Sequence, residues 1–251
     1  MVHLLPLPGS PRARPLSEVI AAALRDANTL VEAGFDGVVV ENFGDAPFLP
    51  LGVSEVTVAA MARVAAELQA LLAGRAALCV NVLRNDARAA LGVAVAVGAS
   101  SIRVNVHAGA RVTDQGVIEG RAWETLRLRS GWGGDDVAIW ADVGVKHSVG
   151  LGTPPLAPED EVGDVVQRGL ADAVIVTGGA TGATVALQTL ERVAARSPVP
   201  VLVGSGVSEA TVRGLLGRAH GVIVGTSIKH GGSTTAAVDP ARAAALVAAA
   251  G

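Results

Sequence analysis

The densest group of ionisable residues follows an apolar run that begins near Val137, where Asp142, Lys146 and His147 lie close together. Alternate side chains of a strand share one face, so Asp142 and Lys146 are expected on the same side. A carboxylate beside a lysine or histidine supports proton transfer or neutralises phosphate charge. The alternative is a surface ion pair with a solvated histidine. We expect Lys146 to face the site, and His147 to reach it only if the strand has already ended.

Polar side chains also follow the other apolar runs. Glu41 is the second acid or base candidate, because a carboxylate is costly at a buried position unless it is used or paired. Arg84 is the candidate guanidinium for an anionic substrate. The candidates for contact with sugar hydroxyls or carbonyls are Asn42, Asn81, Asn105, His107 and Thr177. These polar side chains could instead cap a helix or hold a turn, and His3 in the first run is more often a hydrogen-bonded structural residue than a catalyst.

Two glycine and hydroxyl turns end the last two apolar runs, at Gly204-Ser205-Gly206 and Gly225-Thr226-Ser227. Glycine lets backbone N–H groups approach phosphate oxygens, and the hydroxyls add donors. The pairing of the two turns predicts a phosphate site, whereas either turn alone could be a tight connection that needs glycine for its geometry.

A metal site stays open as an alternative. Glu41, Asp142, His107 and His147 could converge on one divalent ion, since oxygen and imidazole ligands suit several such ions. The spacing of these residues does not establish convergence, and no cofactor is otherwise indicated. Cys79 is the one cysteine, and its position within an apolar run is typical of a buried structural thiol.

The elements that must position these residues recur along the chain. Strand-like apolar runs begin near Val2, Gly37, Ala77, Ser101, Val137, Ala173, Val199 and Gly221. Helical patterns separate them, at 16–33, 54–73, 86–97, 184–195, 208–216 and from 240 onward. Strand, polar tip and helix, repeated eight times, predict an α/β fold, a single (β/α)8 barrel domain over residues 1–251, whose active site lies in the loops after the strands.

Composition limits the class of partner. The net charge is −3 and no basic stripe stands out, which argues against a general nucleic-acid surface. No uncharged apolar run reaches the roughly 20 residues of a membrane-spanning helix. The first run has no basic region before it and is followed at once by Pro6, Pro8 and Pro11, unlike a signal peptide. We therefore expect a cytoplasmic protein without a membrane span, with a homo-oligomer left open.

Several stretches together resemble the BtpA/SgcQ-like family. They are residues 2–11, 40–48, 80–86, 102–107, 114–122, 141–142, 145–147, 203–207 and 222–229. The resemblance implies a TIM barrel of the ribulose-phosphate-binding type, and many members look like sugar-metabolism enzymes. The family name comes from a role in photosystem I accumulation in cyanobacteria. Two departures stand out: Gly144 replaces a histidine expected in many relatives, and residues 177–180 replace a more serine-rich turn.

Two hypotheses follow. The first is an enzyme acting on a small phosphorylated sugar or nucleoside-derived metabolite, as a lyase, isomerase or transferase. Acid and base work would come from Glu41, Asp142, Lys146 and His147. The second is a non-catalytic accessory or assembly factor of the photosystem I biogenesis type. Protection of the fold by phosphate favours the first hypothesis, and a protein partner held by a surface patch favours the second.

Overall fold

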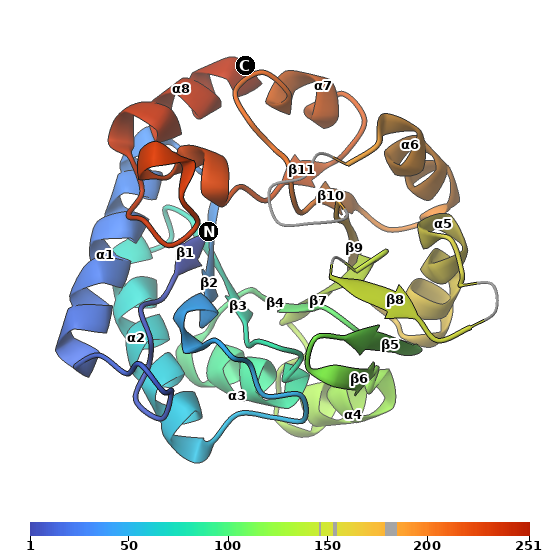
Figure 1. Cartoon of the computed structure of the whole chain (residues 1–251), viewed down its shortest axis with the longest axis horizontal. Helices are drawn as coiled ribbons and strands as arrows, with labels where there is room; N and C mark the ends of the chain where they lie inside the picture. The colour runs from blue at the N-terminus through green and yellow to red at the C-terminus, as the bar shows by residue number, and fades with distance from the viewer. Residues whose placement is uncertain (146, 153–154, 179–184) are drawn as a thin grey trace.

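Eight parallel strands form an inner ring with helices around it, as Figure 1 shows from the end of the barrel. The computed structural model describes residues 1–145, 147–152, 155–178 and 185–251. The strands pair in the order β1 (Val2–His3), β2 (Gly37–Glu41), β3 (Ala77–Asn81), β4 (Ser101–Val104), β7 (Ala138–Val143), β9 (Ala173–Val176), β10 (Val201–Val203) and β11 (Gly221–Val222). The predicted α/β (β/α)8 barrel is confirmed.

The two end strands of this order meet through the backbone. The amine nitrogen of Met1 donates a hydrogen bond of 2.7 Å to the carbonyl oxygen of Val224, directly after β11. This contact brings the first and last strands of the sheet together, which places the residues after β11 beside those of β1.

Alternation along the strands divides the apolar residues into two layers. Val38 and Val40 of β2 pack with the helices in the large outer core. Val39 points the other way and packs with Cys79, Ile175 and Ile223. This period of two is what a pleated strand imposes, and it fixes which polar residues can face the barrel interior.

Among the described residues, six helices overlap the helical patterns predicted from the sequence, whereas the helices at 122–131, 158–162 and 163–168 were not predicted. The helices are α1 (Leu16–Ala33), α2 (Glu55–Leu72), α3 (Ala87–Val97), α4 (Ala122–Gly131), α5 (Pro158–Val162), the π-helix η2 (Gly163–Arg168), α6 (Leu187–Arg196), α7 (Val212–Leu216) and α8 (Pro240–Ala250). Side chains of Ser54, Asp86 and Asp239 cap α2, α3 and α8 by accepting from backbone N–H groups of the first turn. Short 3₁₀ turns cover Phe43–Asp45 (η1), Thr226–Ile228 (η3) and His230–Gly232 (η4).

A second, antiparallel sheet lies in the segments that follow β4 and β7. It consists of β6 (Gly116–Glu119), β5 (Ala110–Thr113) and β8 (Ser148–Gly150). The hairpin between β5 and β6 turns at Asp114-Gln115, and Gly116 supplies the positive φ of 97° that the turn requires. Its signal in the sequence is short, with buried Ile118 between exposed Val117 and Glu119.

A buried ion pair anchors the loop between β11 and α8. The Nζ of Lys229 lies 3.4 Å from Oδ2 of Asp26 on α1 and donates to the carbonyl oxygen of Ala236 at 3.1 Å. The other oxygen of Asp26 accepts from the N–H of Val238 at 2.9 Å. Lys229 is 1% exposed, so its charge depends on this one carboxylate for compensation. The pair fixes the loop that carries Thr234.

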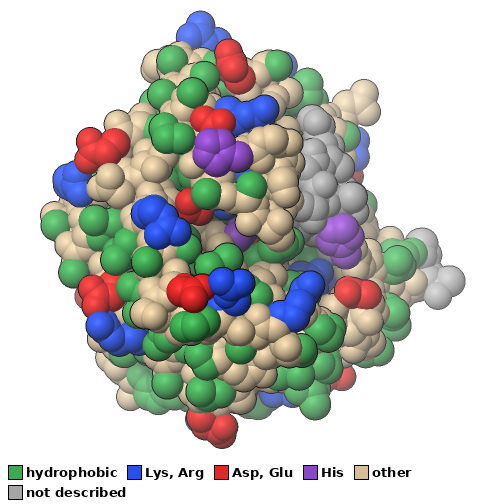
Figure 2. All heavy atoms as spheres, turned by 60° about the vertical axis from the view of Figure 1, so that its left-hand side comes forward, with side chains coloured by type: hydrophobic (Ala, Val, Ile, Leu, Met, Phe, Trp, Pro, Cys, Tyr) green, Lys and Arg blue, Asp and Glu red, His purple; other side chains and the backbone are tan. Residues whose placement is uncertain are grey.

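The surface carries mixed charges. On the face shown in Figure 2, acidic and basic side chains are interspersed and do not gather by sign. Among the described residues, no helix has the length and apolar character that crossing a membrane would require.

We predict that Asp26→Ala lowers the free energy of unfolding by about 3–5 kcal/mol, because it leaves a buried ammonium group without its anion. Urea unfolding followed by circular dichroism measures the change. The control is Glu18→Ala, which removes an exposed i,i+4 pair with Arg14 and should cost less than about 1 kcal/mol. Equal effects of the two substitutions would show that Lys229 is well compensated without Asp26.

Candidate functional site

A row of polar residues crosses the first four barrel strands at their carboxyl ends. His3 is in register with Glu41, Glu41 with Asn81, and Asn81 with Arg103. His3, Glu41 and Asn81 lie two positions after Met1, Val39 and Cys79, which face the barrel interior, so they face it too. Arg103 lies two positions after Ser101, the partner of Cys79 on β4. The barrel therefore replaces its apolar filling with ionisable and amide groups at this level.

Glu41 is held at one carboxylate oxygen, and its other oxygen faces His3. The side-chain amide of Asn81 donates to Oε2 at 2.5 Å, and Oε1 lies 3.8 Å from Nε2 of His3. Glu41 is 6% exposed and lines two cavities. The predicted carboxylate at the barrel mouth is thus present, oriented and within reach of a bound molecule.

Arg103 and Asp142 form a buried bidentate ion pair. Nε and Nη2 of Arg103 donate to the two oxygens of Asp142 at 2.9 and 2.8 Å, and Asn105 donates to the same carboxylate at 3.0 Å. Burial acts to lower the pKa of the Arg103 guanidinium, but the Asp142 carboxylate outweighs it and raises that pKa above the usual range. Arg103 remains a permanent cation, and Asp142 has its lone pairs committed.

His3 is a site residue that sequence reasoning set aside as structural. Its Nδ1 lies 2.9 Å from the carbonyl oxygen of Thr234, and its ring stacks on Phe43 with centroids 4.7 Å apart. It is both hydrogen-bonded, as expected, and part of a cavity wall. Burial lowers the pKa of His3 to about 4, against the raising effects of Glu41 and the Thr234 carbonyl. The signal available in the sequence is a polar residue within the apolar stretch 1–5, at the carboxyl end of β1.

Arg103 was also missed by sequence reasoning. It is a charged residue inside the otherwise apolar run of β4, and alternation from it points to Asn105 as the next inward residue. That isolated charge could have marked it.

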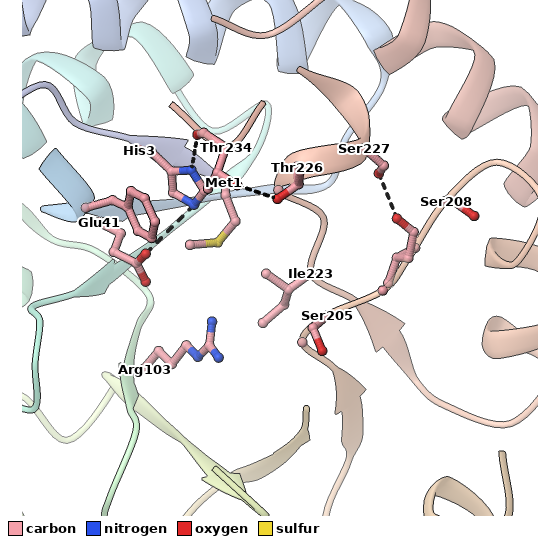
Figure 3. Close-up of a pocket in the computed structure, with 15 residues that line it drawn as sticks. Met1, His3, Glu41, Arg103, Ser205, Ser208, Ile223, Thr226, Ser227 and Thr234 are labelled. Atoms are coloured by element: carbon pink, nitrogen blue, oxygen red, sulfur yellow. Dashed lines mark hydrogen bonds and ion pairs between the residues drawn. The ribbon is translucent and has the colours of Figure 1, made fainter. Parts of the chain in front are cut away.

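The two glycine and hydroxyl turns lie on one cavity, which we call the turn cavity. Its volume is about 250 Å³, and Figure 3 shows the serines and Thr226 on one side with His3, Glu41 and Arg103 on the other. The phosphate candidates Gly204, Ser205, Gly206, Gly225, Thr226 and Ser227 all line it, together with Met1, Phe43, Val207, Ser208, Ile223 and Thr234.

Backbone donors are available in these turns. Within the described chain, the N–H groups of Gly206, Val207 and Gly225 donate no hydrogen bond. Gly206 has a positive φ of 70°, and a Cβ on Gly204 would lie 2.5 Å from Ile175. Glycine is therefore needed for the geometry at both positions. The same turns also have backbone N–H groups without a hydrogen-bond acceptor among the described residues.

Some hydroxyls of the turns are already engaged with the protein. Ser227 donates to the carbonyl oxygen of Val207 at 2.7 Å, and Thr226 pairs with the hydroxyl of Thr234 at 2.9 Å. Ser205 accepts from the N–H of Gly178 at 2.6 Å. The helix that follows, α7, begins only at Val212 and has five residues, so the expected contribution of a helix dipole is small.

A second cavity, which we call the arginine cavity, adjoins the first. Its volume is about 410 Å³, and it shares Glu41, Phe43 and Arg103 with the turn cavity. Its other walls are Phe48, Leu83, Arg84, Asn105, Asp114 and His147. In addition, Oδ1 of Asn105 is buried and accepts no hydrogen bond from the described residues. Arg84 and Asn105, expected as substrate contacts, and His147, expected as an acid or base, thus line one cavity.

The alternation expected from Asp142 onward stops at the end of β7. Strand β7 ends at Val143, and Gly144 and His147 both take positive φ values, so alternation does not extend past the strand. His147 reaches the arginine cavity because the strand has already ended. Lys146, the residue expected to face the site, lies outside the described residues.

Three candidates for substrate contact are engaged in holding the fold. Asn42 clamps Leu83, accepting from its N–H at 2.7 Å and donating to its carbonyl at 3.4 Å. Nε2 of His107 bonds to the carbonyl oxygen of Gly169 at 2.8 Å, and because β4 ends at Val104 the expected alternation fails to carry His107 inward.

Thr177 is the third of these candidates. It donates to the carbonyl oxygen of Gly144 at 3.1 Å and lies beside Gly204 outside both cavities. Its hydroxyl joins the ends of two barrel strands.

The candidate carboxylates and amides do not all open into one space. Glu41 and Asn105 line the arginine cavity. Asn81 and Asp142 do not line it; Asn81 is hydrogen-bonded to Glu41, and Asp142 is paired with Arg103. The suggested convergence of Glu41, Asp142, His107 and His147 on an ion does not occur, because Asp142 and His107 bond elsewhere. Among the described residues, no group of three or more His, Cys, Asp or Glu side chains is arranged to hold a metal.

The fold and the site define a (β/α)8 barrel with a polar, donor-rich cavity at the carboxyl ends of its strands. The chain belongs to the BtpA family, whose model matches residues 1–251. It is 47% identical over 249 residues to the photosystem I biogenesis protein BtpA of Synechocystis, covering 98% of this chain and 85% of the relative. It is 49% identical to a protein of Thermococcus kodakarensis, covering 98% of this chain and 92% of that one.

Two solved enzyme structures illustrate the shared fold. A thiamine phosphate pyrophosphorylase from Pyrococcus furiosus superposes with a TM-score of 0.61 at 12% identity, covering 90% of this chain and 88% of the other. A phosphoribosyl anthranilate isomerase from Thermotoga maritima gives 0.58 at 14% identity, covering 90% and 93%. At these identities the likeness shows the fold alone.

We predict that acid destabilises the protein partly through His3. The folded state resists protonation of His3 until about pH 4, whereas the unfolded chain takes up the proton near 6.5. Between these values the unfolded state binds more protons, so the contribution of His3 is complete above pH 6.5 and is lost as the pH falls. At about 1.4 kcal/mol per unit of pKa shift, the loss approaches about 3 kcal/mol.

Urea unfolding at a series of pH values measures this slope in the wild type, His3→Asn and His230→Asn. Asparagine keeps a donor for Thr234 but does not titrate, so His3→Asn should flatten the decline between pH 6.5 and 4. The decline does not vanish, because burial also lowers the pKa of His107. His230 is exposed and serves as the matched control. An unchanged slope in His3→Asn would contradict the prediction.

Proposed function

We propose that this protein is an enzyme that acts on a small phosphorylated metabolite, a sugar phosphate or nucleoside-derived compound, at the mouth of the barrel. The reaction class is lyase, isomerase or transferase. The carrying observation is that all six turn residues chosen from the sequence line one cavity with His3, Glu41 and Arg103. An anion-binding wall therefore faces ionisable groups across a space sized for a small molecule.

The phosphate group occupies the turn cavity in this proposal. The unengaged N–H groups of Gly206, Val207 and Gly225 donate to its oxygens, and Arg103 supplies a permanent positive charge on the opposite wall. Glycine at Gly204 and Gly225 keeps the backbone accessible, since no Cβ covers it.

The rest of the substrate extends into the arginine cavity. Arg84 and Asn105 bind its polar groups, and the orphaned Oδ1 of Asn105 accepts from a substrate hydroxyl. Phe43 and Phe48 form an apolar wall suited to a ring or carbon chain. Glu41 remains the carboxylate for acid or base work, because Asp142 is committed to Arg103. The acid or base roles of Lys146 and His147 remain predictions. Binding of a divalent ion and formation of a homo-oligomer also remain predictions.

A second candidate is an accessory role in assembling a larger complex. The observation that favours it is the 47% identity to a relative named as a photosystem I biogenesis protein. The two roles differ in what the cavity does: an enzyme needs the anion-binding turns intact, whereas an assembly factor that acts through its outer surface does not.

We predict that Ser208→Asp weakens phosphate binding about tenfold or more, a change of about 1.4 kcal/mol or more, because it places a negative charge on the wall of the turn cavity. Isothermal titration calorimetry with inorganic phosphate and with a ketose phosphate measures it. Ser208 already pairs with Thr211 before α7, so aspartate fits the local backbone.

Ser208→Asn is the matched control, with nearly the same shape and no charge, and should bind close to wild type. Wild-type protein that binds neither phosphate nor the ketose phosphate would refute the proposed function. Equal affinity in the aspartate and asparagine variants would place the anion elsewhere.

A further inference from the structure

The His3 ring has a fixed tautomer. A carbonyl oxygen carries no proton, so the 2.9 Å contact with Thr234 requires Nδ1 of His3 to be the donor. In the neutral ring, Nε2 is then a bare acceptor. Figure 3 shows this nitrogen directed toward Glu41 and not toward Thr234.

Two acceptors therefore face each other across a gap. Nε2 of His3 and Oε1 of Glu41 are 3.8 Å apart, which is too long for a direct hydrogen bond. The other oxygen of Glu41 is held by Asn81, so the carboxylate cannot turn away freely. A hydroxyl that enters from the cavity can lie beside this pair of acceptors and donate its proton to one of them.

The ring is held in place by its surroundings. Phe43 stacks on it at an interplanar angle of 25°. Gly225 packs close to the ring, because a Cβ added to Gly225 would lie 3.3 Å from Cε1 of His3. The loop that supplies Thr234 is anchored by Lys229 and Asp26. Orientation of this kind is what a proton-transferring imidazole needs.

We propose that His3 is the catalytic base of this site, taking a proton through Nε2 from a hydroxyl or carbon acid of a phosphorylated hydroxy-carbonyl substrate, while Glu41 stabilises the imidazolium. This inference rests on the proposed function and names the base and the substrate class for it. The geometry of the acceptor pair and its shared cavity with the anion-binding turns carry the argument.

The proton balance closes within one substrate. For the carbon acid, the substrate C–H bond breaks, its proton passes to Nε2, and its electron pair stays on the substrate. Arg103, on the wall of the same cavity, stabilises the anion formed. Return of the proton from Nε2 to another atom of that anion gives an isomer, with no oxidant, reductant or co-reactant.

Electrostatics around the ring keep it neutral before a substrate binds. Burial lowers the pKa of His3 to about 4, Glu41 and the Thr234 carbonyl oppose this, and Lys229 and the Met1 amine add to it. A bound substrate that excludes water strengthens the attraction of Glu41 for the imidazolium, which aids proton uptake during the reaction.

Long-range proton–nitrogen NMR of the full chain tests the tautomer without any substrate. At pH 7 we expect the His3 signals, assigned by their loss in His3→Asn, to show a proton on Nδ1 and none on Nε2. The His230→Asn spectrum provides the matched control. A proton on Nε2 at pH 7 would overturn the assignment of His3 as base.

Deuterium incorporation tests proton transfer itself. Wild-type protein in heavy water is incubated with a panel of aldose and ketose phosphates, and solvent deuterium is followed by mass spectrometry. We expect incorporation in the wild type and in His230→Asn, and a loss of about 100-fold or more in His3→Asn. Incorporation at the wild-type rate in His3→Asn would exclude His3 as the base.

Binding measured on the same samples separates the two proposals. If sugar phosphates bind the wild type but none of them exchanges deuterium, the role of His3 is contradicted and the proposed function is not. Absence of binding would contradict the proposed function, and the substrate assigned to His3 with it.

Discussion

The buried guanidinium of Arg103 is the constraint around which the barrel mouth is organised. A charge this far from water must be matched by an anion with good geometry, and Asp142 supplies both of its oxygens for this purpose. Asn105 then fills a further lone pair of the carboxylate. Removal of either ion would leave an uncompensated charge in the interior. The positions of Arg103 and Asp142 therefore limit where the other polar side chains of the barrel mouth can lie.

This commitment decides which carboxylate is free to act. Asp142 looked from the sequence like an acid or base, yet its lone pairs are spent on Arg103 and Asn105. Glu41 has only one firm donor, Asn81, and presents its second oxygen toward His3. The two carboxylates therefore differ in role because of their neighbours, which is the usual way that similar groups in one site diverge.

The sequence predicts the barrel well and the site in part. Continuous apolar runs reveal buried parallel strands, and paired glycine turns such as Gly204 and Gly225 reveal the cavity wall, because both depend on local chemistry. The direction of a side chain beyond a strand end is not local. His107 and Asn42 turn toward Gly169 and Leu83, distant in sequence, and the hairpin after β4 is recorded only in a short turn signal.

Polarity across the turn cavity differs from one wall to the other. On the wall formed by the turns, the unengaged N–H groups of Gly206 and Val207 offer donors. Nε2 of His3 and Oε1 of Glu41 offer acceptors, and each is held there by a partner that belongs to the protein. A molecule with an anionic group at one end and hydroxyls at the other matches both walls in only one orientation. His3 and Glu41 cannot hydrogen-bond to each other, so binding such a molecule breaks no hydrogen bond between them. The hydroxyls of the molecule give these two acceptors the donors that they lack in the free protein.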